Sequence, residues 1–336
     1  MEADPSLSIS ALGSSRTFTE RRYDKNVSRR SPSASNLQWK AVLLTVCKVL
    51  KLQLVLVSLA VGLAAGVSEL DRARELYQRT DYAGSLEVLR SVPDGGAAAA
   101  FLIGQDHFML GEYKRAVEAF QKATILDPSN SDYFLWLGRA HGRRAEMSNP
   151  LSAPGHASKA RQSFERSVEL NPRNKEALDD LFDFYLQAPG FMGGGFDKAA
   201  GVARQIAAMD AAEGHFALAQ MAERKKEYNT AEEQLRRAVE LAPRKVGRVI
   251  ELARFLAKRG RYQESDAVFE RAESLAPDSP RVMFAKAKTL IQNQRKLDEA
   301  RDLLRRYIHS SQLTPDDPPR SEAEKLLRHI QSASGD

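Results

Sequence analysis

The strongest constraint on this chain is a residue spacing that repeats every 34 positions. Segments 97–130, 212–245 and 246–279 place small or apolar residues at matching offsets, and each ends in a turn that contains proline. A period of this length is typical of a helix–turn–helix unit, which cannot bury its apolar face alone. Stacking such units buries a continuous core and leaves an elongated surface. We therefore expect an all-α solenoid of antiparallel helix pairs.

The first of these segments shows the physical basis of the spacing. Gly104, Ala116 and Ala123 are small enough to let two helices approach closely. Phe120 and other large residues at helical spacing fill the space between neighbouring units. Pro128 then removes a backbone donor and stops the second helix. The pattern therefore predicts both the helix pair and its end.

The repeated segments also share short motifs. The motifs are GEYKRA at 111–116, EYNTA at 227–231 and GRY at 260–262, FQKA at 120–123 and FERA at 269–272, and closing LDP, LNP, LAP and LAP triplets ending at 128, 172, 243 and 277. Together they resemble the tetratricopeptide repeat, or TPR, over roughly residues 66–310. The resemblance implies a right-handed superhelix of about seven helix pairs in an array over residues 67–310. A capping helix and tail would follow over residues 311–336.

The N-terminal part differs in composition from the repeats. Residues 1–40 are rich in Ser and Arg and are expected to be disordered. Residues 41–66 form an apolar run that follows basic residues and ends in small ones, as in a secretory signal peptide. The same run is long enough to be an uncleaved membrane anchor, although Lys48 and Lys51 interrupt it. Both alternatives stay open.

Either alternative would export the repeats, because positive charge stays on the cytoplasmic side. We expect a bacterial protein that is periplasmic, or membrane-anchored and facing the periplasm. The membrane would be contacted only through the N-terminal segment. Cys47 is the single cysteine and lies in that segment, so the repeats contain no disulfide and no cysteine chemistry.

The charge balance argues against a nucleic-acid partner. The chain has a net charge of +6, but residues 1–66 hold nine Lys/Arg against four Asp/Glu. The remaining residues hold 41 basic and 40 acidic side chains and are close to neutral. A nucleic-acid-binding domain needs a basic face, and this balance gives no bulk support for one.

The TPR resemblance implies a partner-binding groove on the concave face, lined by the first helix of each pair. Apolar side chains recur at the fifth position of each repeat, and basic or amide side chains recur at the ninth. This mixture suits an extended or helical peptide. The implied groove residues are Phe101, Gln105, Phe108, Leu135, Arg139, Arg143, Asp179, Asp183, Phe216, Gln220, Ile250, Arg254, Phe284 and Lys288. The alternative is that the phenylalanines simply pack between helices.

Two insertions supply a second candidate surface. Segments 147–158 and 187–196 each separate the two helices of adjacent pairs, so both are expected as loops on one edge of the solenoid. Long loops in compact folds are often functional. The candidate residues of this loop edge are Pro154, His156, Phe191 and Met192. The alternative is that both insertions are tolerated surface loops.

The sequence shows no catalytic, cofactor or metal site. The six histidines include no His-Glu-x-x-His run, and no serine lies in a Gly-x-Ser-x-Gly context. His107 and His141 occupy equivalent first-helix positions and are interpreted as packed structural residues. Asp179, Asp180 and Asp183 could gather on one face, where a solvated acidic surface is the simpler interpretation.

These observations favour a non-enzymatic scaffold without cofactors, which holds a segment of a partner protein in the cell envelope. The lysine and asparagine clamp of chaperone-binding TPR domains is absent, since no fifth position is lysine and no ninth is asparagine. An alternative is an accessory subunit of an envelope enzyme or of a secretion or assembly complex, docked through segments 147–158 and 187–196. A sugar-binding enzyme would need clustered carboxylates in the groove.

Overall fold

A computed structural model describes residues 69–92 and 95–334 of the chain. The expected leader (1–40) and the expected signal peptide or anchor (41–66) lie outside these residues. Within the described ranges every regular element is a helix and no strand occurs, which confirms the all-α solenoid. None of the described helices has the length and apolarity needed to cross a bilayer.

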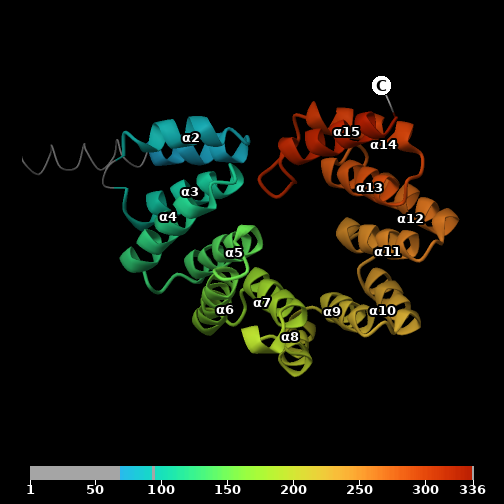
Figure 1. The fold of residues 1–336 in the computed structure, drawn as a ribbon, viewed down its shortest axis with the longest axis horizontal. Helices are drawn as coiled ribbons and strands as arrows, with labels where there is room; N and C mark the ends of the chain where they lie inside the picture. Colours follow the sequence, from blue (N-terminus) through green and yellow to red (C-terminus); the bar gives the residue numbers. More distant parts are fainter. Residues whose placement is uncertain (1–68, 93–94, 335–336) are drawn as a thin grey trace, which may run out of the picture. The chain divides into compact units, whose positions relative to one another are not determined.

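The described helices form consecutive antiparallel pairs (Figure 1). A helix over residues 69–78 pairs with α2 (Tyr82–Leu89). The next pairs are α3 (Gly96–Met109) with α4 (Tyr113–Leu126), α5 (Ser131–Met147) with α6 (Ala153–Leu170), α7 (Lys175–Gln187) with α8 (Phe196–Met209), α9 (Ala211–Arg224) with α10 (Tyr228–Leu241), α11 (Val246–Lys258) with α12 (Tyr262–Leu275), and α13 (Pro280–Gln292) with α14 (Leu297–Ile308). Helix α15 (Arg320–Ser334) follows and packs on α14.

Glycine in the first helix and phenylalanine in the second helix set the spacing within two of the pairs. A Cβ atom added at Gly104 would lie 2.5 Å from the ring of Phe120, and one added at Gly138 would lie 2.5 Å from the ring of Phe164. Ala116 of the first of these pairs has no solvent exposure. The helices therefore approach as closely as the missing side chain allows, and the phenylalanine ring covers the glycine backbone.

The fourth pair solves the same packing problem in reverse. Phe182 stands in α7 at the position that glycine occupies in α3, and it is buried. Its partner helix α8 carries Ala203 at the position of Phe120. Phe182 and Ala203 belong to one buried cluster. Exchanging the large and small residues between the two helices keeps the total volume, which well-packed cores tolerate.

The expectation that segment 147–158 is a loop is wrong. Helix α5 runs to Met147 and α6 begins at Ala153, so Pro154 and His156 lie in the first turn of α6. Proline is well suited to a helix start because its fixed φ matches the helix and its missing N–H has no intrahelical partner there. The extra residues lengthen both helices, and only Ser148–Ser152 connect them.

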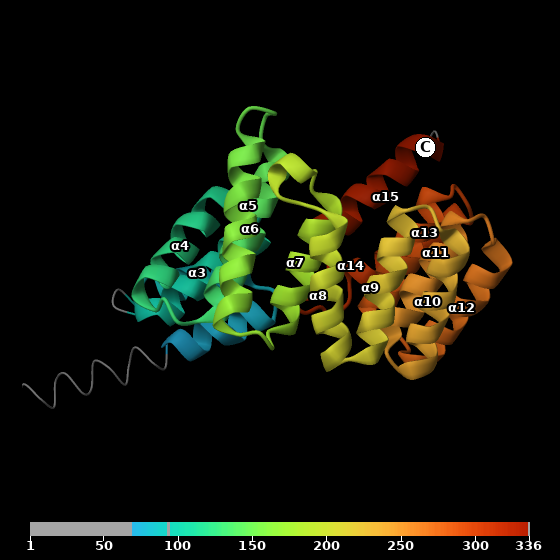
Figure 2. The same cartoon turned by 90° about the horizontal axis from the view of Figure 1, so that it is seen from below.

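Segment 187–196 does connect two helices, through a short 3₁₀ turn η1 (Gly190–Met192). Its glycines have identifiable roles. Gly193 adopts a φ of 93°, which is a left-handed conformation that other residues rarely adopt. A Cβ atom at Gly194 would lie 1.9 Å from the carbonyl oxygen of Ala188. The turn η1 contacts α6, and the α5–α6 connection lies at the same end of the helices (Figure 2).

One buried carboxyl group breaks the apolar pattern of the core. Asp106 of α3 has no solvent exposure, and its Oδ2 accepts a hydrogen bond of 2.7 Å from the Ser85 hydroxyl of α2. Its Oδ1 is buried and has no hydrogen-bond partner among the described atoms. Burial raises the pKa of Asp106 to about 7, although the Ser85 hydroxyl opposes the shift.

The close helix approach predicts opposite effects for two glycines of α5. Gly138→Ala should destabilise the array by about 1–3 kcal/mol, because its methyl group would overlap the ring of Phe164. Gly142→Ala is the matched control, since no atom lies within 4 Å of its added Cβ. That substitution should leave stability unchanged or raise it by about 0.5–1 kcal/mol. Urea unfolding followed by circular dichroism measures both, and equal effects would contradict the packing account.

Asp106 predicts a loss of stability as the pH rises. Because its folded pKa of about 7 exceeds the ordinary 3.8, the unfolded chain loses this proton first between about pH 4 and pH 7. The resulting loss in the free energy of unfolding is roughly 4 kcal/mol and is complete above pH 7. Asp106→Asn should therefore be more stable than the parent at pH 8, by about 1–3 kcal/mol after the cost of an unpaired amide. Asp71→Asn, at an exposed position, should change the free energy of unfolding at pH 8 by less than about 0.5 kcal/mol.

Candidate functional site

The inner side of the helix array holds a cavity of about 1100 Å³. Its walls come from the first helix of six pairs and from the segment before α15, and no second helix contributes. Tyr77, Gln105 and Arg139 line it from the N-terminal pairs, and Arg254 and Lys288 line it from the C-terminal ones. We use the name concave surface for the first-helix side chains that line this cavity and the adjacent cavities described below.

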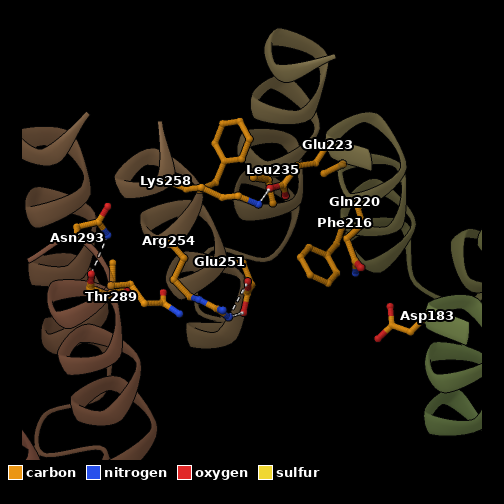
Figure 3. A pocket seen from close by; sticks show the side chains of 13 residues that line it. Asp183, Phe216, Gln220, Glu223, Leu235, Glu251, Arg254, Lys258, Thr289 and Asn293 are labelled. Atoms are coloured by element: carbon orange, nitrogen blue, oxygen red, sulfur yellow. Dashed lines mark hydrogen bonds and ion pairs between the residues drawn. The ribbon is translucent and has the colours of Figure 1, made fainter. Parts of the chain in front are cut away.

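A second cavity of about 630 Å³ lies among α9, α11 and α13 (Figure 3). Phe216 and Gln220 of α9 face it from one side, and Asn293 after α13 faces it from the other. Two ion pairs border it. Lys258 Nζ lies 2.5 Å from Glu223 Oε1, and Arg254 donates at 3.0 Å to Glu251 of the same helix. The cavity thus combines an aromatic face with amide and charged groups.

Most of the predicted groove residues border these cavities. Gln105, Phe108, Arg139, Asp179, Ile250, Arg254, Phe284 and Lys288 line the largest cavity. Phe216 and Gln220 line the second, together with Asp183. Arg143 lines a smaller one of about 380 Å³ between α5 and α7. The structure therefore brings these residues to one surface, and their role in binding a partner stays a prediction.

Two predicted groove residues do not lie on the concave surface. Leu135 is 1 % exposed and packs in the cluster that contains Leu178 of the next pair. Phe101 belongs to an aromatic cluster, with its ring centroid 4.7 Å from that of Tyr133. In these two repeats the side chain is covered by packing against a neighbouring repeat, whereas Asp179 and Phe216, at the same position of later repeats, line cavities. Ile250 and Phe284 border the cavity but are nearly buried, for the same reason.

A buried carboxylate, which sequence reasoning missed, crosslinks the middle of the concave surface. Glu213 in the first turn of α9 is only 2 % exposed. Its carboxylate lies 2.8 Å from Arg248 and 2.5 Å from Lys245, both near the start of α11, and 3.5 Å from Lys175 at the start of α7. The guanidinium of Arg248 also lies 3.5 Å from the ring centre of Phe216. Three successive first helices are thereby tied together.

The cations around Glu213 decide its protonation state. Burial alone would raise the pKa of Glu213, but Lys245, Arg248 and Lys175 outweigh burial and lower it. The acid is therefore charged at neutral pH. The sequence offered one signal for Glu213, an acidic residue in the first turn of a helix, where negative charge is favoured. Its partners could not be predicted, because their helices become neighbours only in the fold.

The acidic residues of α7 are not a simple solvated face. Arg139 of α5 donates to Asp180 at 2.6 Å and lies 3.0 Å from Glu176, and Lys175 donates to Asp179 at 2.7 Å. The side chain of Asp183 forms no hydrogen bond or ion pair with another described residue. Its burial and the neighbouring Asp180 and Asp179 raise the pKa of Asp183 to about 6.

His141 is a buried histidine that packs beside a second histidine in the α5–α6 pair. No group of three or more His, Cys, Asp or Glu side chains within residues 69–92 and 95–334 is arranged to hold a metal ion. His141 is 3 % exposed, and its Nδ1 lies 3.3 Å from Nδ1 of His156. Burial lowers the pKa of His141 to about 4 and also lowers the pKa of His156, so both rings are neutral at pH 7 and one Nδ1 donates to the other.

The first and last parts of the described array meet at the rim of the largest cavity. Arg320 at the start of α15 donates at 3.0 Å to the Thr80 hydroxyl, which lies 240 residues earlier. Arg320 also donates to the backbone carbonyls of Ile308 and Ser310, at 3.1 Å each. Pro318 and Tyr77 line the cavity on the two sides of this junction. The cavity is thus bordered by both ends of the array.

Comparison with protein-family models agrees with this arrangement. Tetratricopeptide repeat models match residues 97–130, 193–245 and 250–318. The chain is a tetratricopeptide repeat protein. The resemblance of its motifs is confirmed, and the matched residues cover the pairs α3–α4, α9–α10, α11–α12 and α13–α14 as well as helix α8.

Solved TPR structures share the fold at low sequence identity. A tetratricopeptide repeat protein from Parabacteroides merdae is 14 % identical, with a TM-score of 0.51, and the match covers 80 % of this chain and 99 % of that one. A TPR protein from Thermus thermophilus is 18 % identical, with a TM-score of 0.45, over 60 % of this chain and 98 % of that one. A search of curated proteins found no match. At 14 % identity, the Parabacteroides merdae structure establishes the fold alone.

The Glu213 network predicts a pH-dependent loss of stability in a single variant. Glu213→Gln should lower the free energy of unfolding by about 2–3 kcal/mol at pH 7, because three cations lose their carboxylate. This is below the value for a fully buried pair, since Lys175 and Lys245 are partly exposed. Because the folded pKa is lowered, the advantage of the parent should fade as the pH falls below about 4.

The exposed residue Glu240 provides the matched control for Glu213. It pairs only with Arg237, within the same helix. Glu240→Gln should change the free energy of unfolding by less than about 0.5 kcal/mol. If both variants behave alike in urea unfolding at pH 7, Glu213 does not organise the concave surface.

Proposed function

We propose that this TPR protein is a non-catalytic scaffold that holds a segment of a partner protein against its concave surface. The observation that carries the proposal is the cavity of about 1100 Å³ whose walls are first-helix side chains. Concave sites that combine apolar walls with a few placed polar groups are suited to binding. Phe108 and Phe284 offer apolar contact there, and Gln105 offers an amide.

The charges of the cavity favour a segment with acidic or hydrogen-bonding groups. Its lining contains seven Lys or Arg residues against four Asp or Glu residues. Most of these cations already pair with carboxylates of the chain, as Lys288 does with Glu322 at 3.0 Å. Arg281 of α13 lines the same cavity and forms no ion pair with a described carboxylate. It is therefore the cation best placed for an acidic group of a partner.

The pairing of most carboxylates on the concave surface supports a non-catalytic role, and the unpaired Asp183 is the exception. A catalytic acid or base needs a group that is free to exchange a proton with a substrate. On the concave surface Asp180 is bound to Arg139, and Glu213 is held by three cations. These contacts stabilise the helix array, and the fold itself is one whose surface is commonly used for protein binding.

We further propose that the protein works in the bacterial cell envelope. Support comes from the order of the N-terminal sequence, in which basic residues precede an apolar run and small residues follow it. This order fits a secretory signal or an anchor that leaves the repeats on the periplasmic side.

The proposal predicts that substitutions on the concave surface abolish partner capture without unfolding the array. The combined variant Gln220→Ala, Arg254→Ala and Lys288→Ala removes three side chains that line the cavities. Its helicity should match the parent, and specific partners in a pull-down from bacterial envelope should be lost, with at least a tenfold decrease for about 1.4 kcal/mol of lost contacts.

A variant on the second helices provides the control. Lys122→Ala, Arg166→Ala and Arg237→Ala alter exposed side chains of α4, α6 and α10, which lie away from the cavities. This variant should capture the same partners as the parent. Retention by the concave variant, or loss in the control, would place binding elsewhere on the molecule.

A further inference from the structure

The edge formed by the α5–α6 connection and η1 exposes large apolar side chains. Leu151 is 95 % exposed, Phe191 is 83 % exposed and Met147 is 72 % exposed. We call these three residues the apolar edge. Met147 ends α5, Leu151 lies in the α5–α6 connection and Phe191 lies in η1. This connection and η1 lie at one end of the helices (Figure 2), and η1 contacts α6. Leaving this apolar surface in contact with water costs free energy unless something outside the described residues covers it.

Local hydrogen bonds hold these side chains outward. The Asn149 side chain accepts hydrogen bonds from the backbone N–H groups of Leu151 and Ser152, at 3.1 and 3.0 Å. The Ser148 hydroxyl donates at 2.6 Å to the carbonyl of Arg144 and closes the end of α5. In the other connection, Lys198 donates at 2.8 Å to the carbonyl of Gly193. Leu151 and Phe191 therefore project from two turns that hydrogen bonds hold in place.

Basic residues flank the apolar edge. Arg144, Lys159 and Lys198 lie on the same connections or on the adjoining helix turns, and none forms an ion pair with a described carboxylate. The acidic side chains of the edge are Glu146, whose charge is balanced by Arg143 at 2.5 Å, and Asp197. Segments 142–160 and 187–198 together contain four Lys or Arg residues and two Asp or Glu residues. The edge is therefore net positive.

We propose that the apolar edge docks on an anionic lipid bilayer, with Leu151 and Phe191 inserted at the boundary between headgroups and acyl chains. Apolar side chains that enter this boundary, accompanied by basic side chains near the headgroups, are the combination that binds peripheral proteins to anionic membranes. Arg144, Lys159 and Lys198 would remain at headgroup level, because long basic side chains keep their charge in water.

The shape of the edge favours lipid over a protein partner. Hot spots of protein interfaces lie in well-packed pockets near the centre of a contact. Leu151 and Phe191 instead protrude, at 95 % and 83 % exposure, whereas Met147 borders a cavity of about 420 Å³. A fluid bilayer needs no matching shape. The proposal does not depend on the concave surface, so the failure of either leaves the other intact.

A fluorescent probe at each position tests the proposal. In the full chain with Cys47→Ser, single variants Leu151→Cys and Phe191→Cys are labelled with a nitrobenzoxadiazole dye. Vesicles of equal parts phosphatidylglycerol and phosphatidylcholine are then added. Both probes should shift to shorter emission wavelengths and brighten severalfold. Vesicles of phosphatidylcholine alone should give a clearly smaller response, because the electrostatic contribution is missing.

Ile125→Cys provides the matched control. Ile125 is 79 % exposed and lies in the last turn of α4, at the end of the helices away from the α5–α6 connection. Its probe should not respond, even when the N-terminal segment attaches the chain to the vesicles. In a second comparison, Arg144→Gln, Lys159→Gln and Lys198→Gln together should remove the preference for anionic vesicles.

Two results would overturn the proposal. One is a response at residues 151 and 191 that equals the response at residue 125. The other is a response to soluble envelope proteins but not to vesicles, which would assign the edge to a protein contact.

Discussion

The architecture depends on how closely the two helices of each pair approach. Where α3 and α5 carry glycine, a phenylalanine from the partner helix lies against the bare backbone, with no room for a methyl group. This contact sets the distance between the helices and therefore the step from one pair to the next. The reversed arrangement of Phe182 and Ala203 shows that total volume, rather than residue identity, is what the spacing requires.

The same stacking decides which side chains can bind. Because the second helices do not reach the largest cavity, it is lined by the inner sides of the first helices. The starts of α7, α9 and α11 then lie side by side, and their Lys and Arg residues meet the carboxylate of Glu213. A buried charge of this kind is costly unless it is fully paired. Three partners from two neighbouring helices satisfy it and fix how the pairs join.

The sequence predicted the fold and most of the concave surface, because both follow from the period. Counting positions within each repeat predicts which first-helix residues face the inner side of the array, as it did for Gln105 and Arg254. Counting failed for Leu135 and Phe101, because packing against a neighbouring repeat covers these two side chains. The Glu213 network was missed because its members are brought together only by stacking.

The insertions show a further limit of sequence reasoning. Segment 147–158 was expected to be a loop because it is an insertion between the two helices of its pair. Pro154 instead lies in the first turn of α6, and the added residues lengthen α5 and α6. Proline predicts a break only inside a helix, and its position relative to the helix start is not visible in the sequence alone.

The most direct test of the concave-surface account is photo-crosslinking in bacterial cells. Benzoylphenylalanine is placed singly at Arg254 or Lys288, which line the largest cavity, and at Arg237 on the exposed side of α10. The account predicts crosslinks to one small set of proteins from positions 254 and 288 and none of these from position 237. Crosslinks from position 237 alone, or the same products from all three positions, would contradict it.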